Sequence, residues 1–112
     1  SKKKQVKKSF QELINDLMSS SSEKVRYNAA RVLGEMGDSK AVEPLINVLK
    51  NDKNGSVRLY AARALGELGD TKATEHLIES LREDRNVDVR VRAARALGRL
   101  GGKIVVEPLV EA

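Results

Sequence analysis

The strongest constraint on this chain is a string of fourteen residues that occurs three times at a fixed spacing. Residues 57–70 read VRLYAARALGELGD, and residues 25–38 and 89–102 each match them at ten of the fourteen positions. The copies begin at residues 25, 57 and 89, so the period is 32 residues. A fixed period of this length is typical of repeat proteins, in which each unit buries its apolar face only against its neighbours.

A second string repeats with the same period. It reads FQELINDL at 10–17, VEPLINVL at 42–49, TEHLIESL at 74–81 and VEPLVEA at 106–112. Ala, Leu and Val dominate the apolar residues, which favours helices in close contact over strands. We therefore predict one all-α domain, an α-solenoid of antiparallel helix pairs over residues 9–112. Its units lie at about 10–37, 42–69 and 74–101, a half unit at 103–112 ends it, and a basic tail at 1–8 precedes it.

Capping residues mark the predicted helix boundaries. Favoured N-cap types stand just before each second helix: Ser22, Asn54 and Asn86. A glycine follows each one, where a positive φ is often needed: Gly37, Gly69 and Gly101. Asp38 and Asp70, with Ser39 and Thr71, then supply caps for the next first helix. Pro44 and Pro108 lie in opening turns, where proline does least damage.

A helical wheel divides the second helix into two faces. In the first copy, one stripe holds Ala29, Val32, Leu33 and Met36, and we predict that it faces the core. The opposite stripe faces outward and holds Tyr27, Asn28, Arg31 and Glu35. The paired alanines and the single glycine of each copy are small enough to let neighbouring helices approach closely.

The composition excludes several classes of function. The chain has no cysteine, so disulfides, thiolate metal sites and cysteine nucleophiles are ruled out. The single histidine, His76, is too few for a zinc site, which needs three or four protein ligands. No apolar run approaches the roughly 18 residues of a membrane span. We expect a cytoplasmic protein with no metal, no cofactor and no catalytic residues.

The net charge of +5 is unevenly placed. Five lysines lie in SKKKQVKK at residues 1–8, and the rest of the chain has equal numbers of basic and acidic residues. The tail is interpreted as a polar cap on the first unit, with Val6 and Phe10 covering the exposed end of the array. Binding of nucleic acid or an anionic surface is the alternative.

These residues resemble a known family. AVEPLINVL at 41–49, followed by VRLYAARALGELGD at 57–70, is similar to the HEAT-like repeats of phycobilisome-lyase-related proteins and to designed alphaRep scaffolds. The resemblance covers nearly the whole chain from about residue 9, although its period of 32 residues is one longer than usual. It implies three HEAT-like repeats in which the second helices line a concave face.

The resemblance also implies where a partner would bind. The variable binding positions of the related scaffolds fall at 23, 24, 27, 28, 31 and 35 of the first unit and at the equivalent positions of the others. The outward stripe of the wheel contains the same side chains. We predict a protein partner, acidic in character, that contacts Tyr27, Asn28, Arg31, Leu59, Tyr60, Arg63, Val91, Arg92, Arg95 and Arg99.

The arginines differ in their expected roles. Arg31 and Arg63 have a glutamate four residues on, so mutual neutralisation competes with a docking role. Arg92, Arg95 and Arg99 share one face with no acid in their helix after Asp88, and are either solvated surface or an anion site. Arg26, Arg58 and Arg90 follow the core valine in each copy. In similar repeats this arginine bonds across the stack to loop acids such as Asp52 or Asp84.

The function predicted from these features is a non-catalytic protein-interaction scaffold. The alternative is a nucleic-acid-binding module that uses the third unit and the lysine tail. A helper role in chromophore attachment rests on the resemblance alone. The half unit at 103–112 also lacks a polar cap, so either the chain is a piece of a longer protein or this end meets another molecule, which leaves self-association open.

Overall fold

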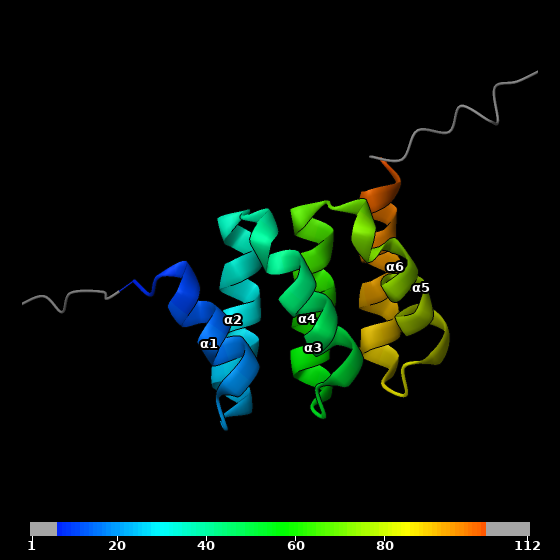
Figure 1. The fold of residues 1–112 in the computed structure, drawn as a ribbon. Coiled ribbons are helices and arrows are strands. Elements are labelled where there is room, and N and C mark those ends of the chain that lie inside the picture. Colours follow the sequence, from blue (N-terminus) through cyan, green and yellow to red (C-terminus); the bar gives the residue numbers. More distant parts are fainter. Residues whose placement is uncertain (1–6, 103–112) are drawn as a thin grey trace, which may run out of the picture.

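The computed structural model describes residues 7–102 and shows six α-helices in three antiparallel pairs (Figure 1). The first helices are α1 (Phe10–Ser19), α3 (Val42–Asn51) and α5 (Thr74–Glu83). The second helices are α2 (Glu23–Met36), α4 (Gly55–Leu68) and α6 (Val87–Gly101). The all-α fold predicted from the repeat is therefore confirmed. Most of the basic tail, the Val6 contact and the half unit at 103–112 lie outside the described residues.

Side-chain caps fix where most of these helices begin. The predicted N-caps are present: Ser22, Asn54 and Asn86 accept hydrogen bonds from backbone N–H groups in the first turns of α2, α4 and α6. Ser9 and Glu12 form a reciprocal capping box at α1. Asp38 and Asp70 instead cap short 3-10 turns, Ser39–Ala41 and Thr71–Ala73, which lead into α3 and α5. The expectation that these aspartates cap the first helices directly is wrong, because a 3-10 turn lies between each aspartate and its helix.

The glycines at the helix ends behave in two ways. Gly37 and Gly69 adopt positive φ values of 74° and 69°, as expected. Gly101 is the last residue of α6, and the C-cap after it, Gly102, has a φ of −69°. The prediction of a left-handed Gly101 is therefore wrong. The first two units carry Asp38 and Asp70 after this glycine and continue into a 3-10 turn, whereas the third carries a second glycine.

The helices form two layers, with the second helices in one and the first helices in the other (Figure 1). The core between the layers is built from leucine and valine, with Leu33, Leu65 and Leu77 fully buried. Alanines on the second helices let these helices pack closely against one another. Gly34 and Gly66 lie close to the neighbouring second helix, because a Cβ there would stand 2.8 Å from Ala64 and 2.9 Å from Ala96.

The first unit departs from the predicted core stripe. Met36 was expected in the core, but it is 46% exposed, and Val32 is only half-buried. The equivalent residues of the third unit, Ala96 and Leu100, are buried. The reason is position in the stack: this stripe packs on the preceding unit, and α2 has no described helix pair before it.

Candidate interaction surface

The outward residues of α2, α4 and α6 make up what we call the second-helix surface. Two of its tyrosines, from neighbouring helices, stack on each other: the rings of Tyr27 and Tyr60 have centroids 5.2 Å apart and lie within 16° of parallel. Both rings, and Leu59, also pack partly against the core. These three residues were predicted as partner contacts, yet much of their apolar area is already covered by the protein itself. Of the predicted apolar contacts, Val91 is the one left largely exposed, at 46%.

Arginine–glutamate pairs neutralise the first two units of this surface. Arg31 donates to Glu35 at 3.2 Å, and Arg63 donates to Glu67 at 3.3 Å, each across one helical turn. Exposed pairs of this kind contribute only about 0.3–0.5 kcal/mol to stability. Their main effect here is to cancel the local positive potential, as the sequence suggested.

The third unit brings its arginines together. A groove of about 240 Å³ between α4 and α6 is lined by Arg63, Glu67, Ala96, Arg92, Arg95 and Arg99. We call it the arginine groove. Within residues 7–102, none of Arg92, Arg95 and Arg99 forms an ion pair. Three like charges at helical spacing repel one another, so the groove is suited to an anionic group that approaches from solvent.

Sequence reasoning missed one wall of this groove. Glu67 was noted only as the partner of Arg63, but its carboxylate also lies over Gly34 of the neighbouring helix, 2.6 Å from where a Cβ would stand. The absence of a side chain at Gly34 makes room for it. No repeat alignment pairs these two residues, because Gly34 aligns with Gly66 and Glu67 with Glu35, so the contact could be found only from the geometry between the helices.

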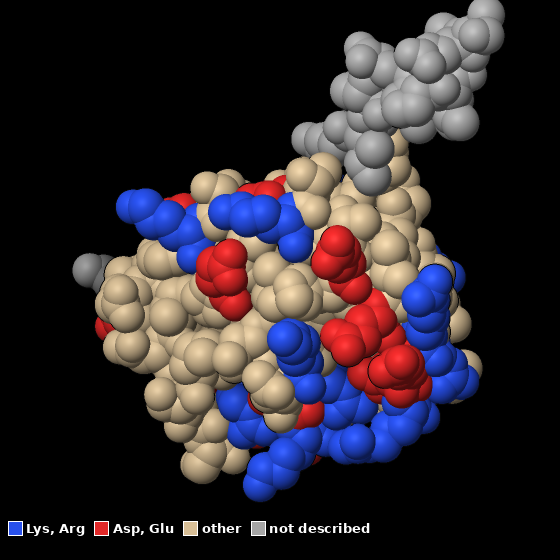
Figure 2. Space-filling model, turned by 45° about the vertical axis from the view of Figure 1, so that its right-hand side comes forward, with Lys and Arg blue, Asp and Glu red and all other residues tan. Residues whose placement is uncertain are grey.

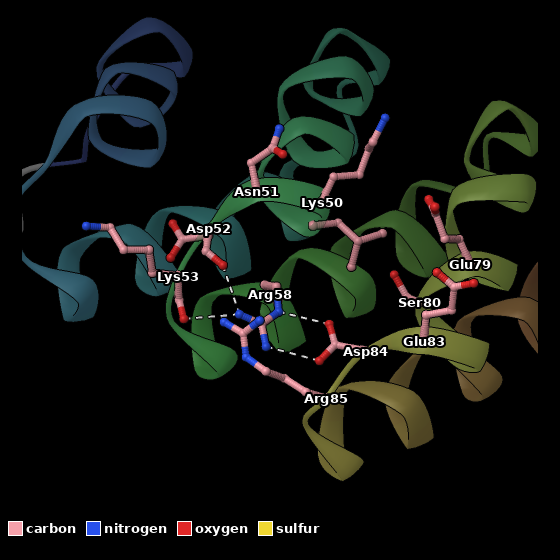
Figure 3. Close-up of a pocket in the computed structure, with 11 residues that line it drawn as sticks. Lys50, Asn51, Asp52, Lys53, Arg58, Glu79, Ser80, Glu83, Asp84 and Arg85 are labelled. Carbon is pink, nitrogen blue, oxygen red and sulfur yellow. Dashed lines mark hydrogen bonds and ion pairs between the residues drawn. The ribbon is translucent and has the colours of Figure 1, made fainter.

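A second set of arginines links successive units. Arg58, at the start of α4, donates two hydrogen bonds to the Asp84 carboxylate in the next unit, at 2.9 and 3.0 Å. It also donates to the backbone carbonyl oxygens of Asp52 and Lys53 (Figure 3). Arg26 makes the same forked contact with Asp52, at 2.9 and 3.2 Å. The predicted role of these arginines as bonds across the stack is confirmed at both positions.

The Arg58–Asp84 pair is nearly closed to solvent, with 7% and 8% of the two side chains exposed. Burial alone would raise the pKa of Asp84. Two effects outweigh burial and lower the pKa of Asp84 below its ordinary value. They are the hydrogen bonds that the carboxylate accepts from Arg58 and from the Asn86 backbone N–H, and the positive charges of Arg58 and Arg85. Asp84 is therefore held as a carboxylate at neutral pH. The pocket beside it, about 390 Å³ in volume, is lined mostly by charged and polar side chains around this structural pair.

Charge on the rest of the protein is mixed. Figure 2 shows acidic side chains grouped directly beside basic ones on the face turned toward the viewer. His76 lies in α5 and lines a shallow pocket with Glu75 and Glu79. The part of the chain described here contains no cluster of three metal-ligating side chains, and none of its helices has the length and apolarity to cross a membrane.

Comparison with known proteins agrees with the geometry of the stack. Residues 10–97 match the family of HEAT repeats. The chain belongs to the HEAT-repeat family. Residues 89–112 also match the PBS lyase HEAT-like repeat. None of the curated proteins compared with this chain matches it.

A solved structure is similar to this HEAT-repeat chain over most of its length. It is a chain from the complex of CpcE and CpcF of phycocyanin lyase from Nostoc sp. PCC7120. The sequences are 34% identical, the TM-score is 0.78, and the match covers 88% of this chain. It covers 39% of the solved chain, so the present chain spans well under half of that relative's length. The chain is thus a HEAT-repeat module related to phycocyanin lyase subunits.

Proposed function

We propose that this module is a non-catalytic interaction scaffold that binds an acidic segment of a protein partner. The observation that supports the proposal most directly is the arginine groove. Its anionic occupant would be held by Arg92, Arg95 and Arg99, while the exposed Val91 supplies apolar contact nearby. Arginine suits this role because its planar guanidinium binds carboxylates in a forked geometry.

The other residues predicted to contact the partner should contribute to binding to different extents. Arg31 and Arg63 are already paired, so they would contribute less than the third unit. Tyr27 and Tyr60 would offer the edges of a fixed aromatic stack, which binds with little loss of side-chain freedom. Asn28 and Leu59 lie beside them, partly buried. The concave shape of this surface and a cytoplasmic location remain predictions.

A charge-matched pair of variants tests this proposal. The full chain is titrated with a fluorescein-labelled peptide that alternates Glu and Asp with Leu and Tyr. Changing Arg92, Arg95 and Arg99 to Glu should weaken binding at least about tenfold, because close, partly desolvated charge pairs are lost. The control changes Lys40, Lys50 and Arg82 to Glu, which gives the same net charge with exposed residues of other elements. Equal weakening by both variants would refute a defined groove.

Nucleic-acid binding is the competing function, favoured by the same unpaired arginines. The two functions differ in their response to salt, since each phosphate contact contributes about −0.9 to the slope of log affinity against log salt on duplex DNA. We expect a labelled duplex to bind weakly and to dissociate at physiological salt while the acidic peptide stays bound. The opposite ranking would favour nucleic acid.

The similarity to a phycocyanin lyase subunit suggests a particular class of partner. A helper role in chromophore attachment, with a phycobiliprotein or a second repeat protein as partner, is consistent with the non-catalytic scaffold proposed here. Co-purification of a coloured biliprotein with the tagged chain would support it. The acidic-peptide experiment does not depend on this outcome.

A further inference from the structure

The helices α2, α4 and α6 stand in a row (Figure 1), so the arginine groove between α4 and α6 has an equivalent between α2 and α4. The positions that correspond to its lining, one unit earlier, hold Arg31, Glu35, Tyr60, Arg63, Ala64 and Glu67. Two arginines and two glutamates cancel there. The arginine groove holds four arginines and one glutamate, which leaves a net charge of +3. Positive charge on this surface is therefore concentrated between α4 and α6.

Glu67 belongs to both sets of positions, so the direction of its side chain matters. Ala64 marks the side of α4 that faces α2, and Gly66 marks the side that faces α6. With about 100° between successive residues of a helix, Glu67 falls on the α2 side of the midline and Arg63 on the α6 side. The coordinates agree, because Glu67 Oε1 lies 2.6 Å from where a Cβ of Gly34 on α2 would stand. The carboxylate is turned toward α2, away from the arginines of α6.

The groove arginines are left available by this arrangement. Arg92 and Arg99 stand at the positions of Tyr60 and Glu67, on the side of α6 that faces α4. Within residues 7–102, neither forms an ion pair with Glu67. Arg63 donates its Nε to Glu67 at 3.3 Å, and its Nη groups form no hydrogen bond in that part of the chain. Donors from both helices can therefore bind an anion from solvent.

Glu67 is also a built-in competitor for that anion. It is the one acidic residue that lines the arginine groove. It stands one unit before Arg99 at the same position of the repeat, so the two side chains start at the same level of the stack. A Glu67 carboxylate turned toward α6 would neutralise an arginine and fill space that a ligand carboxylate needs. Strong binding requires that this carboxylate be held on the other side.

Gly34 holds the carboxylate there by leaving a notch in α2. The space that a Cβ of Gly34 would take is occupied by Glu67 Oε1, so any side chain at this position would displace the carboxylate. The effect of the notch is visible in solvent exposure. The Glu67 side chain is 21% exposed, whereas that of Glu35, its equivalent in the first unit, is 52% exposed. Glu35 has no described helix before it that could offer such a notch.

We propose that Gly34 and Glu67 are positioning residues of the arginine groove. Their role rests on the proposed function and deepens it. Seated over Gly34, the Glu67 carboxylate holds the Nε of Arg63 and leaves Arg92 and Arg99 to the acidic segment of the partner. Displaced from this seat, the carboxylate turns toward α6 and competes with the partner. The affinity of a groove between α4 and α6 is thus controlled from α2.

The acidic peptide of the groove assay measures this control. Gly34→Ala should weaken binding up to about fivefold, the scale of an exposed ion pair that the ligand must displace. Adding Glu67→Gln should restore the affinity, because the displaced side chain no longer carries a charge. Glu67→Gln alone should bind at least as tightly as the unchanged chain. Glu35→Gln, the same change one unit earlier, is the matched control and should leave the affinity unchanged.

Rescue by Glu67→Gln separates the charge effect from damage to the stack. Gly34→Ala also places its Cβ 2.8 Å from the Cα of Ala64, and Glu67→Gln does not remove this contact. A loss of affinity caused by distorted packing would therefore persist in the double variant. Thermal denaturation sets a temperature at which every variant is folded. Where Gly34→Ala alone is too unstable, adding Ala64→Gly removes the contact with the Ala64 Cβ and leaves the Glu67 carboxylate displaced.

A second measurement needs no peptide. In the Gly34→Ala background, Glu67→Gln and Arg99→Gln should be coupled in a double-mutant cycle of urea denaturation, whereas in the unchanged chain they should be nearly additive. The proposal is overturned if Glu67→Gln fails to rescue peptide binding, or if the coupling is equal in both backgrounds. A chain that binds no acidic peptide at all would refute the proposed function instead, and the cycle would still test the seat of Glu67 by itself.

Discussion

One glycine occurs at the same position of every second helix, and the structure gives its three copies different surroundings. A Cβ at Gly66 would stand 2.9 Å from the Ala96 Cβ and 3.0 Å from the Ala96 Cα. One at Gly98 would meet nothing within 4 Å. Replacing each glycine with alanine should therefore change stability in opposite directions, although the two positions look identical in sequence.

The magnitudes follow from two opposing terms. Alanine is more favourable than glycine inside a helix by about 1 kcal/mol. At Gly98 this term acts alone, so Gly98→Ala should raise the melting temperature by about 4 °C. At Gly66 the added methyl meets the backbone of α6, and overpacking of this kind costs about 1–3 kcal/mol. The cost of overpacking exceeds the gain in helix propensity over most of this range, so the net effect should be a loss of up to about 2 kcal/mol in the free energy of unfolding.

Thermal and urea denaturation followed by circular dichroism measure both changes. Gly34→Ala, which would place a Cβ 2.8 Å from the Ala64 Cα, should behave like Gly66→Ala. Adding Ala96→Gly to Gly66→Ala removes the nearer contact, so the double variant should be more stable than the sum of the single changes. The reasoning is refuted if Gly66→Ala and Gly98→Ala shift stability equally, or if Gly66→Ala stabilises the protein.

Three further predictions concern charge and stacking. Asp84→Asn should lower the free energy of unfolding by about 3 kcal/mol, because it breaks a buried ion pair. Glu35→Gln breaks an exposed pair and should lower it by under about 0.5 kcal/mol. Similar losses for the two variants in urea denaturation would contradict the argument from burial. The pKa of Asp84 is lowered on folding, so its contribution to the free energy of unfolding is complete above the unfolded pKa of about 3.9 and is lost as pH falls through the folded pKa. The difference in stability between wild type and Asp84→Asn should therefore be constant from pH 6 to 8 and should narrow below about pH 4. Tyr27→Ala and Tyr60→Ala should each destabilise the protein but show a coupling of about 0.5–1.5 kcal/mol in a double-mutant cycle, and strict additivity would exclude the stack.

Much of the fold could be predicted because the same physical demands recur every 32 residues. The N-caps of the second helices were predicted in all three copies, and the structure confirms them. The glycine at a helix contact is confirmed for Gly34 and Gly66, and the arginine after the core valine bonds across the stack at Arg26 and Arg58. The Arg58–Asp84 contact was foreseen through the family resemblance, and the spacing of 26 residues is met again by Arg26 and Asp52.

What could not be predicted depends on differences between copies. Tyr27 and Tyr60 occupy different positions of the repeat, so alignment by period does not bring them together, yet their rings stack across the gap between α2 and α4. Met36 has a core pattern but an exposed side chain, since the pattern cannot say whether a preceding unit is present to cover it. The turn after α6 lacks the positive φ of its counterparts, and a second glycine stands there in place of the aspartate that follows Gly37 and Gly69.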